Sequence, residues 1–200
     1  MPDKNKPVPK EWKLLLDADT IQRAISRISY EILERNRDIE NLAIVGIHTG
    51  GEYLGRRIRD RLQEIEKVKI PFGTIDITLY RDDLSNIQAT PILKGTDLPF
   101  PVTGSTIVLV DDVLFTGRTI RAALDAIIDF GRPRCVQLAI LVDRGHRELP
   151  IRPDYIGKNL PTGKEESVHL RLSEQGYPDG VYLGKRQGRK KVDRKSNEEE

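Results

Sequence analysis

Two adjacent aspartates followed by a turn of small residues are the residues best suited to chemistry in this chain. Asp111 and Asp112 end the apolar run Ile107–Val110, and the turn Thr116–Thr119 precedes a segment in which apolar residues recur with helical spacing. Carboxylates accept hydrogen bonds from a ribose diol and favour a nearby divalent cation. Free backbone N–H groups at the start of a helix bind phosphate. These parts predict a sugar-phosphate site, against the alternative of an ordinary strand–turn–helix corner with surface aspartates.

The elements that must position this site alternate between strands and helices. Apolar runs without alternation are typical of strands buried on both faces of a parallel sheet. Such runs predict strands at Leu42–Ile47, Ile107–Val110 and Val136–Val142. Apolar residues at helical spacing predict helices from Asp17 or Asp19 to about Asn36, over about Glu52–Ile65, and from Ile120 to about Phe130. We therefore expect an α/β fold, a mainly parallel sheet flanked by helices, whose ligand site lies at the carboxyl ends of the strands.

The remaining segments are shorter or richer in turns. Val68–Tyr80 reads as strand, in which Pro71 and Gly73 mark a bend or separate two short pieces, and a long loop follows it through Gly104. Tyr155–Leu160, Val168–Leu172 and Val181–Leu183 predict short strands that finish the sheet or form a small cap. Residues 1–13 are rich in proline and charge, which predicts a disordered leader. Residues 185–200 are a run of charged residues, which predicts a disordered tail. Residues 14–184 would then form the folded domain.

Composition limits the class of protein. The 200 residues suit a single domain. The one cysteine, Cys135, excludes an intramolecular disulfide, and its apolar neighbours predict a buried thiol. No apolar run reaches membrane-spanning length and residues 1–13 lack the core of a signal peptide, so we expect a cytoplasmic protein. The net charge is only +2, so any surface for a nucleic acid must come from a local arrangement of cations.

Longer strings around these residues resemble a known family. Val108–Thr119 resembles the phosphoribosyl pyrophosphate (PRPP) motif of type I phosphoribosyltransferases. Asp76–Leu84, Leu141–Ile151 and Asp154–Asn159 resemble the pyrimidine operon regulator (PyrR) family, and the resemblance extends over roughly Leu15–Leu172. Members of that family are both uracil phosphoribosyltransferases and RNA-binding attenuators. The resemblance implies the type I phosphoribosyltransferase fold, with a mobile loop and a small cap.

The resemblance also implies an enzyme site that makes UMP and diphosphate from uracil and PRPP. Catalytic roles fall on Asp111 and Asp112, with Mg²⁺ carried by PRPP near them and no direct metal ligation by the protein. The positions that match the phosphate-binding segment are Val113, Leu114, Phe115, Thr116, Gly117, Arg118 and Thr119. The pyrophosphate loop matches His48, Thr49, Gly50 and Gly51, and the mobile loop matches Tyr80, Arg81 and Asp82. The positions expected near uracil are Val142, Asp143 and Arg144.

A regulatory role is implied in the same way. It predicts binding to the pyrimidine operon leader mRNA when UMP or UTP occupies the site, by a homodimer or a larger homo-oligomer. The positions that match the RNA surface are Ser26, Arg27, Tyr30, Arg35, Arg147, Arg152 and Lys158. Tyr30 stands where the family has histidine, and a tyrosine ring can stack on an exposed base. The alternative is a nucleobase salvage enzyme without an RNA function.

The pyrophosphate loop departs from the family pattern. Relatives carry lysine and arginine where this chain has His48 and Gly50, so one cationic side chain is replaced by an imidazole and the other is absent. Backbone N–H groups and metal must then supply most of the stabilisation of the leaving diphosphate. We therefore expect weak catalysis at neutral pH together with nearly unimpaired UMP binding, because UMP carries no diphosphate.

Overall fold

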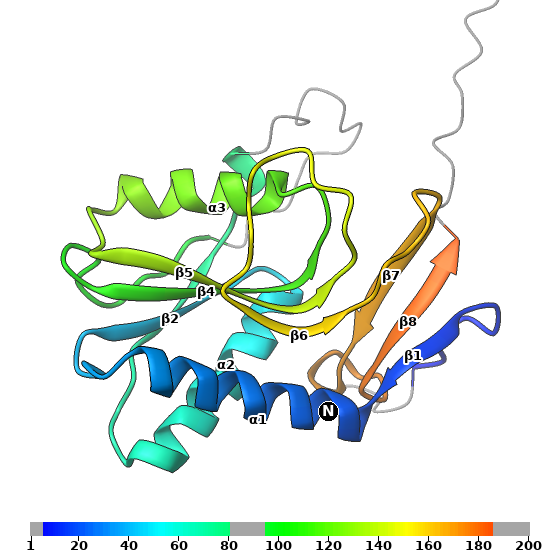
Figure 1. The fold of residues 1–200 in the computed structure, drawn as a ribbon, viewed down its shortest axis with the longest axis horizontal. Helices are drawn as coiled ribbons and strands as arrows, with labels where there is room; N and C mark the ends of the chain where they lie inside the picture. Colours follow the sequence, from blue (N-terminus) through cyan, green and yellow to red (C-terminus); the bar gives the residue numbers. More distant parts are fainter. Residues whose placement is uncertain (1–5, 81–94, 186–200) are drawn as a thin grey trace, which may run out of the picture.

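A parallel sheet with helices on both faces forms the body of the protein (Figure 1). The computed structural model describes residues 6–80 and 95–185. The strands lie in the order β3-β2-β4-β5-β6, with bounds β2 Leu42–Ile47, β3 Phe72–Ile75, β4 Thr106–Leu114, β5 Cys135–Asp143 and β6 Tyr155–Asn159. Helices α1 (Ala18–Arg35) and α2 (Gly50–Glu66) cover one face and α3 (Arg118–Asp129) covers the other. The predicted α/β fold is confirmed.

The central strand β4 shows why its apolar run does not alternate. Val108 and Val110 pack into the core under α1 and α2, whereas Ile107 and Leu109 pack into the core under α3. Both faces are therefore buried, as the unbroken run predicts. The strand continues to Leu114, beyond the predicted end at Val110, because its pairing with β5 continues to the carboxyl end of that strand. The acidic pair thus belongs to the strand itself.

Two predictions about local structure are wrong. The segment Val68–Tyr80 contains only the short strand β3, and a 3-10 turn, Thr78–Tyr80, follows it. The Asp76 carboxylate accepts a hydrogen bond from the Thr78 backbone N–H (2.9 Å), which ends the extended conformation. Cys135 is exposed rather than buried, because it stands at the amino end of β5 and not within its apolar run.

A second sheet forms the cap. Its antiparallel strands lie in the order β1-β8-β7, with bounds β1 Lys13–Asp17, β7 Glu166–Arg171 and β8 Gly180–Lys185. It lies beyond the carboxyl ends of the main strands (Figure 1). In the part of the chain that the structure describes, no helix combines the length and apolarity needed to cross a membrane.

The predicted disordered leader is wrong for residues 6–13. The Lys6 backbone N–H donates to Gly176 O (2.9 Å), and the Trp12 ring stacks on His169 with 4.0 Å between ring centres. Lys13 already belongs to β1, whose pairing with β8 satisfies the backbone. The predicted tail beyond residue 185 lies outside the described residues.

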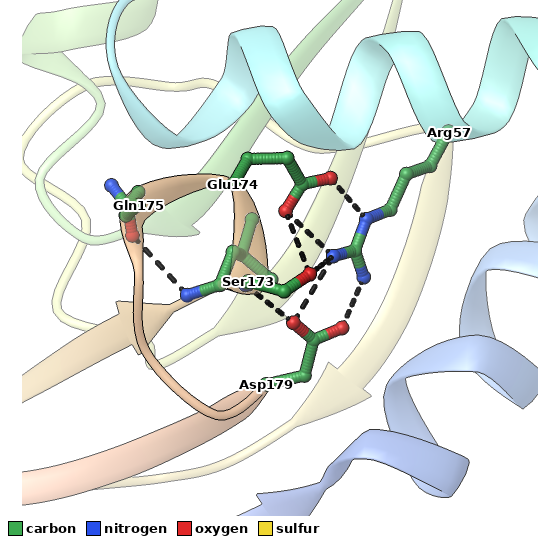
Figure 2. Close-up of polar contacts among 6 residues, drawn as sticks. Arg57, Ser173, Glu174, Gln175 and Asp179 are labelled. Carbon is green, nitrogen blue, oxygen red and sulfur yellow. Dashed lines mark hydrogen bonds and ion pairs between the residues drawn. The ribbon is translucent and has the colours of Figure 1, made fainter. Parts of the chain in front are cut away.

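One arginine fastens the cap to the body. Arg57 of α2 donates from Nε to Glu174 Oε1 (2.8 Å) and from Nη2 to Asp179 Oδ1 (3.1 Å) and Ser173 Oγ (3.2 Å), as Figure 2 shows. Burial alone would raise the pKa of Glu174 and of Asp179, but hydrogen bonds from Arg57 outweigh it and lower both. These contacts join residues more than a hundred positions apart, so they hold a tertiary arrangement rather than a local turn.

We predict that Arg57→Leu lowers the free energy of unfolding at pH 7 by about 2 kcal/mol, because it leaves two partly buried carboxylates without their cation. The lowered pKa values mean that this stabilisation is present above the unfolded-state pKa of about 4 and is lost as pH falls through the folded values. The difference between the two proteins should therefore shrink at pH 3.

Denaturant unfolding at both pH values measures this. The control is Arg56→Leu on the same helix. Arg56 is exposed and contacts Glu52, so its loss should change the free energy of unfolding by less than about 1 kcal/mol. Equal effects of the two substitutions at pH 7 would contradict the role given to Arg57.

Candidate functional site

A cleft of about 640 Å³ separates the carboxyl ends of the main strands from the cap. The body contributes His48, Thr49, Gly50, Asp76, Ile77, Thr78, Asp111, Asp112, Val113 and Thr119. The cap contributes Val168, His169, Leu170, Arg171 and Gln175. The structure therefore brings the acidic pair, the predicted pyrophosphate loop and the end of the predicted phosphate turn into one space.

The acidic pair is held by its own backbone. Asp111 Oδ1 accepts from the Asp112 N–H (2.9 Å), and Asp112 Oδ1 accepts from the Val113 N–H (2.8 Å). Burial raises the pKa of Asp111 well above its usual range, and the adjacent charge of Asp112 raises it further. Burial also raises the pKa of Asp112, while its hydrogen bonds and the positive charge of Arg171 oppose that rise. Hydroxyl donors or a cation from a ligand would relieve this desolvation.

The loop at residues 48–51 presses against the acidic pair. A Cβ on Gly51 would lie 2.2 Å from Val110 O, and one on Gly50 would lie 2.3 Å from Asp112 Oδ2. Only glycine fits without displacing these atoms, so the loop backbone approaches the strand directly. Helix α2 begins at Gly50, which places its unpaired first N–H groups at the cleft. His48 Nδ1 lies 2.8 Å from Glu52 Oε2, so any positive charge on this imidazole faces a carboxylate.

The phosphate turn is built around Gly117. Its φ of 93° is in the left-handed region that favours glycine, and α3 begins at the next residue. Of the seven residues predicted to bind phosphate, Val113 and Thr119 line the cleft. Leu114 is buried, and Phe115 packs edge-on against His146 with ring centres 5.7 Å apart.

The segment 145–151 braces that turn. Thr116 O accepts from the backbone N–H groups of Glu148 (2.9 Å) and Leu149 (3.2 Å), and Arg118 Nε contacts Glu148 Oε2 at 2.8 Å. Arg147 donates to Phe115 O (3.0 Å) and pairs with Asp143. The guanidinium of Arg147 is therefore occupied beside the phosphate turn, apart from the other residues predicted to bind RNA.

The residues predicted to lie near uracil are beside the cleft but do not line it. Val142 is fully buried in the core, and Asp143 accepts from the Gly145 N–H (2.9 Å). Arg144 is 5% exposed and donates to Thr162 Oγ1 (2.9 Å), with its guanidinium 4.1 Å from the centre of the Phe115 ring. This arginine ties the end of β5 to the segment before β7.

The other predicted RNA residues gather on α1 and β6. Arg27 donates to the carbonyls of Ile156 (2.8 Å) and Gly157 (2.7 Å), which precede Lys158 on β6. Arg35 contacts Asp154 at 2.5 Å, just before β6, and Tyr30 is 53% exposed. The two residues that complete this group are Ser26, partly buried on α1, and Arg152, exposed ahead of β6.

The cleft includes residues that the site prediction missed: Asp76, Thr78, His169, Arg171 and Gln175. Asp76 could have been found, because it opens the string Asp76–Leu84 that carries the family resemblance. The cap residues had no local signal, because their position depends on how the small sheet pairs. Tyr80, predicted in the mobile loop, donates to Asp129 on α3 (2.6 Å), while Arg81 and Asp82 lie outside the described residues.

Comparison with known proteins gives the same family as the motifs. A profile described as the phosphoribosyl transferase domain matches residues 11–174. A protein of Halalkalibacterium halodurans named bifunctional protein PyrR is 57% identical over 173 residues, which are 86% of this chain and 96% of that protein. Its namesake in Clostridioides difficile is 58% identical over 169 residues, covering 84% of this chain and 96% of the relative.

Solved structures agree with the fold. The hypoxanthine phosphoribosyltransferase of Trypanosoma cruzi has a TM-score of 0.66 at 18% identity, over 86% of this chain and 97% of that one. A hypoxanthine phosphoribosyltransferase of Staphylococcus aureus has a TM-score of 0.63 at 18% identity, over 88% and 92%. These likenesses support the fold alone, whereas the family profile and the PyrR relatives confirm the resemblance read from the motifs. The chain therefore belongs to the phosphoribosyltransferase domain family and, within it, to the bifunctional PyrR proteins.

Proposed function

We propose that this protein converts uracil and PRPP to UMP and diphosphate, and that it binds the leader mRNA of pyrimidine genes in response to UMP or UTP. The observation that carries the enzymatic part is the single cleft in which the acidic pair meets the glycine loop and the phosphate turn. The family of its relatives supports the regulatory part. A salvage enzyme without an RNA function is the alternative.

In the proposed reaction the bond from the ribose C1′ to the diphosphate oxygen breaks, and the uracil N1 forms a bond to C1′ and loses its proton. The start of α3 at Arg118 and Thr119 would hold the 5′-phosphate through backbone N–H groups. Asp111 and Asp112 would accept hydrogen bonds from the ribose hydroxyls and stabilise the positive charge that develops on the sugar. The cap would limit access of water to that centre.

The site suits a magnesium ion that arrives with PRPP. Carboxylate oxygens such as those of Asp111 and Asp112 are ligands that Mg²⁺ prefers. No group of three or more histidine, cysteine or acidic side chains is arranged to hold a metal within residues 6–80 and 95–185. We propose that PRPP oxygens and water provide most of the coordination, and that the ion offsets the charge of the diphosphate.

For the regulatory role we propose the surface of α1 and β6 that carries Arg27, Tyr30, Arg35, Arg152 and Lys158. Its exposed tyrosine could stack on an unpaired base, and its cations could contact phosphates. A cytoplasmic location and a homodimer or larger homo-oligomer are parts of the same proposal.

The first prediction from this proposal concerns PRPP. Asp112→Asn should weaken binding of PRPP with Mg²⁺ by about ten- to a hundredfold, because it removes the charge from one ribose acceptor while keeping the oxygen that binds the Val113 N–H. Calorimetric titration measures the change, with Asp125→Asn on the exposed face of α3 as the control. Unchanged PRPP affinity in Asp112→Asn would remove the acidic pair from the proposed site.

A second prediction concerns stability. Because the folded-state pKa of Asp111 is raised, its ionisation destabilises the ligand-free protein increasingly as pH rises above about 4. Asp111→Asn should raise Tm at pH 7 by roughly 2–4 °C, the shift that about 1 kcal/mol gives at this chain length, and by less at pH 4. Calorimetric melts at both pH values test this, and a lower Tm at pH 7 would contradict it.

The third prediction concerns RNA. Arg27→Ala should weaken binding to pyrimidine leader RNA, and the log–log slope of affinity against salt should fall by roughly 0.7–0.9 if one phosphate contact is lost. UMP should tighten RNA binding, and RNA should tighten UMP binding by the same factor. Filter binding with a scrambled hairpin at matched salt provides the control. Equal affinity for both RNAs in the presence of UMP would leave the salvage alternative.

A further inference from the structure

Among the described residues, the cleft is lined by more carboxylates than cationic side chains. Asp76, Asp111 and Asp112 line it, and Arg171 is the only lysine or arginine among the described residues that do so. The loop at residues 48–51 contributes neither lysine nor arginine. A diphosphate carries several negative charges, so a cation from another element of the cleft would add to the stabilisation that backbone N–H groups and Mg²⁺ supply.

Arg171 has unused donors. Its guanidinium lies 5.1 Å from the centre of the Trp12 ring and 5.0 Å from that of Tyr177. Within residues 6–80 and 95–185, its buried Nε has no hydrogen-bond partner, and its one hydrogen bond is a long contact to Leu170 O (3.4 Å). No ion pair found among the described residues includes it. An arginine that lies beside two aromatic rings and has an unsatisfied buried donor is suited to an anionic ligand.

The placement of β7 puts Arg171 at the correct end of the cleft. The strand begins near Glu166, whose carbonyl accepts from Arg144 at the end of β5 (2.8 Å). It ends at Arg171, two residues before Ser173, which Arg57 of α2 contacts (Figure 2). Helix α2 begins at the glycine loop that is proposed to bind diphosphate. Arg171 therefore lies at the end of the cap nearest that helix, away from the uracil side.

We propose that Arg171 contacts the diphosphate of PRPP and is the side-chain cation that the loop of this chain lacks. The assignment rests on the proposed function, because it names a contact within that reaction's substrate. Trp12 and Tyr177 lie beside the guanidinium, and Arg57 holds the turn that directly follows the strand carrying it. The planar fork of arginine matches two diphosphate oxygens at once.

The test compares inorganic diphosphate with Mg²⁺, PRPP with Mg²⁺, and UMP as calorimetric titrants of the full chain. Arg171→Met keeps an unbranched side chain beside the rings but removes the charge. It should weaken the binding of diphosphate and of PRPP by about ten- to a hundredfold, while the affinity for UMP stays within twofold. Arg171→Lys keeps a point charge and should lose less. Arg134→Met, at the amino end of the sheet near Thr106, removes the same charge far from the cleft and should change none of the three.

Trp12 supplies a second readout. It is the only tryptophan of the chain and stacks on His169, which lines the cleft. Diphosphate should change its fluorescence in the unaltered protein and fail to do so in Arg171→Met at the same concentration. If Arg171→Met does not fold, Arg171→Lys carries both measurements, with a several-fold loss for diphosphate and none for UMP.

The outcomes separate the two levels of inference. If Arg171→Met changes the affinities for diphosphate and PRPP by less than twofold, the assignment of Arg171 is overturned and the proposed function stays in place. An equal loss of affinity for UMP and for diphosphate would also overturn this assignment, because the effect of Arg171 would then not be specific to the diphosphate. An unaltered protein that binds none of the three would overturn the proposed function and this assignment together.

Discussion

The desolvation of two adjacent carboxylates is the constraint on which the rest of the site depends. Asp111 and Asp112 stand in the last residues of a strand that is buried on both faces, and burial raises the pKa of both. The surroundings add to this cost, since the loop at Gly50 and Gly51 fills the space beside the carboxylates with backbone. Such an arrangement is unfavourable in the empty protein. A ligand that brings hydroxyl donors and a divalent cation would reverse that balance, so stability and binding are opposed at this position.

Arginines of the body contact the two ends of β7 and so fix the separation between the cap and the body. Arg144 follows the end of β5. It donates to the carbonyls of Gly163, just before β7, and of Glu166, the first residue of β7. Arg57, from α2, holds Glu174 and Asp179 after the strand has ended. Both guanidinium groups belong to the body of the protein and both act on the cap. The separation of the two layers is therefore defined by side chains and not by the length of a connecting loop.

The sequence predicted the elements that are buried and missed those that depend on distant partners. The apolar runs of β2, β4 and β5 carry their own evidence, because two buried faces require apolar side chains throughout. β3 was predicted too long, because the alternation of apolar and polar residues continues past Asp76, whose carboxylate accepts from the Thr78 N–H and ends the strand. Strand β1 was not predicted, and its first residue was assigned to the disordered leader, because the stability of this strand comes from β8, more than 160 residues later. Arg171 could not be found for the same reason: its place in the cleft follows from cap pairing and from Arg57.

The cap and the proposed RNA surface are joined directly, because no loop separates strand β1 of the cap from helix α1. Strand β1 ends at Asp17 and α1 begins at Ala18. The Asp17 carboxylate accepts from the Thr20 N–H (2.8 Å), so the same residue pairs with Gly180 in the cap and caps the helix. Any displacement of the small sheet is then transmitted to the first turn of α1, because no flexible residue lies between them to absorb it. Ligand in the cleft and RNA on α1 would thus act on one continuous element, which offers a structural route for coupling between the two proposed sites.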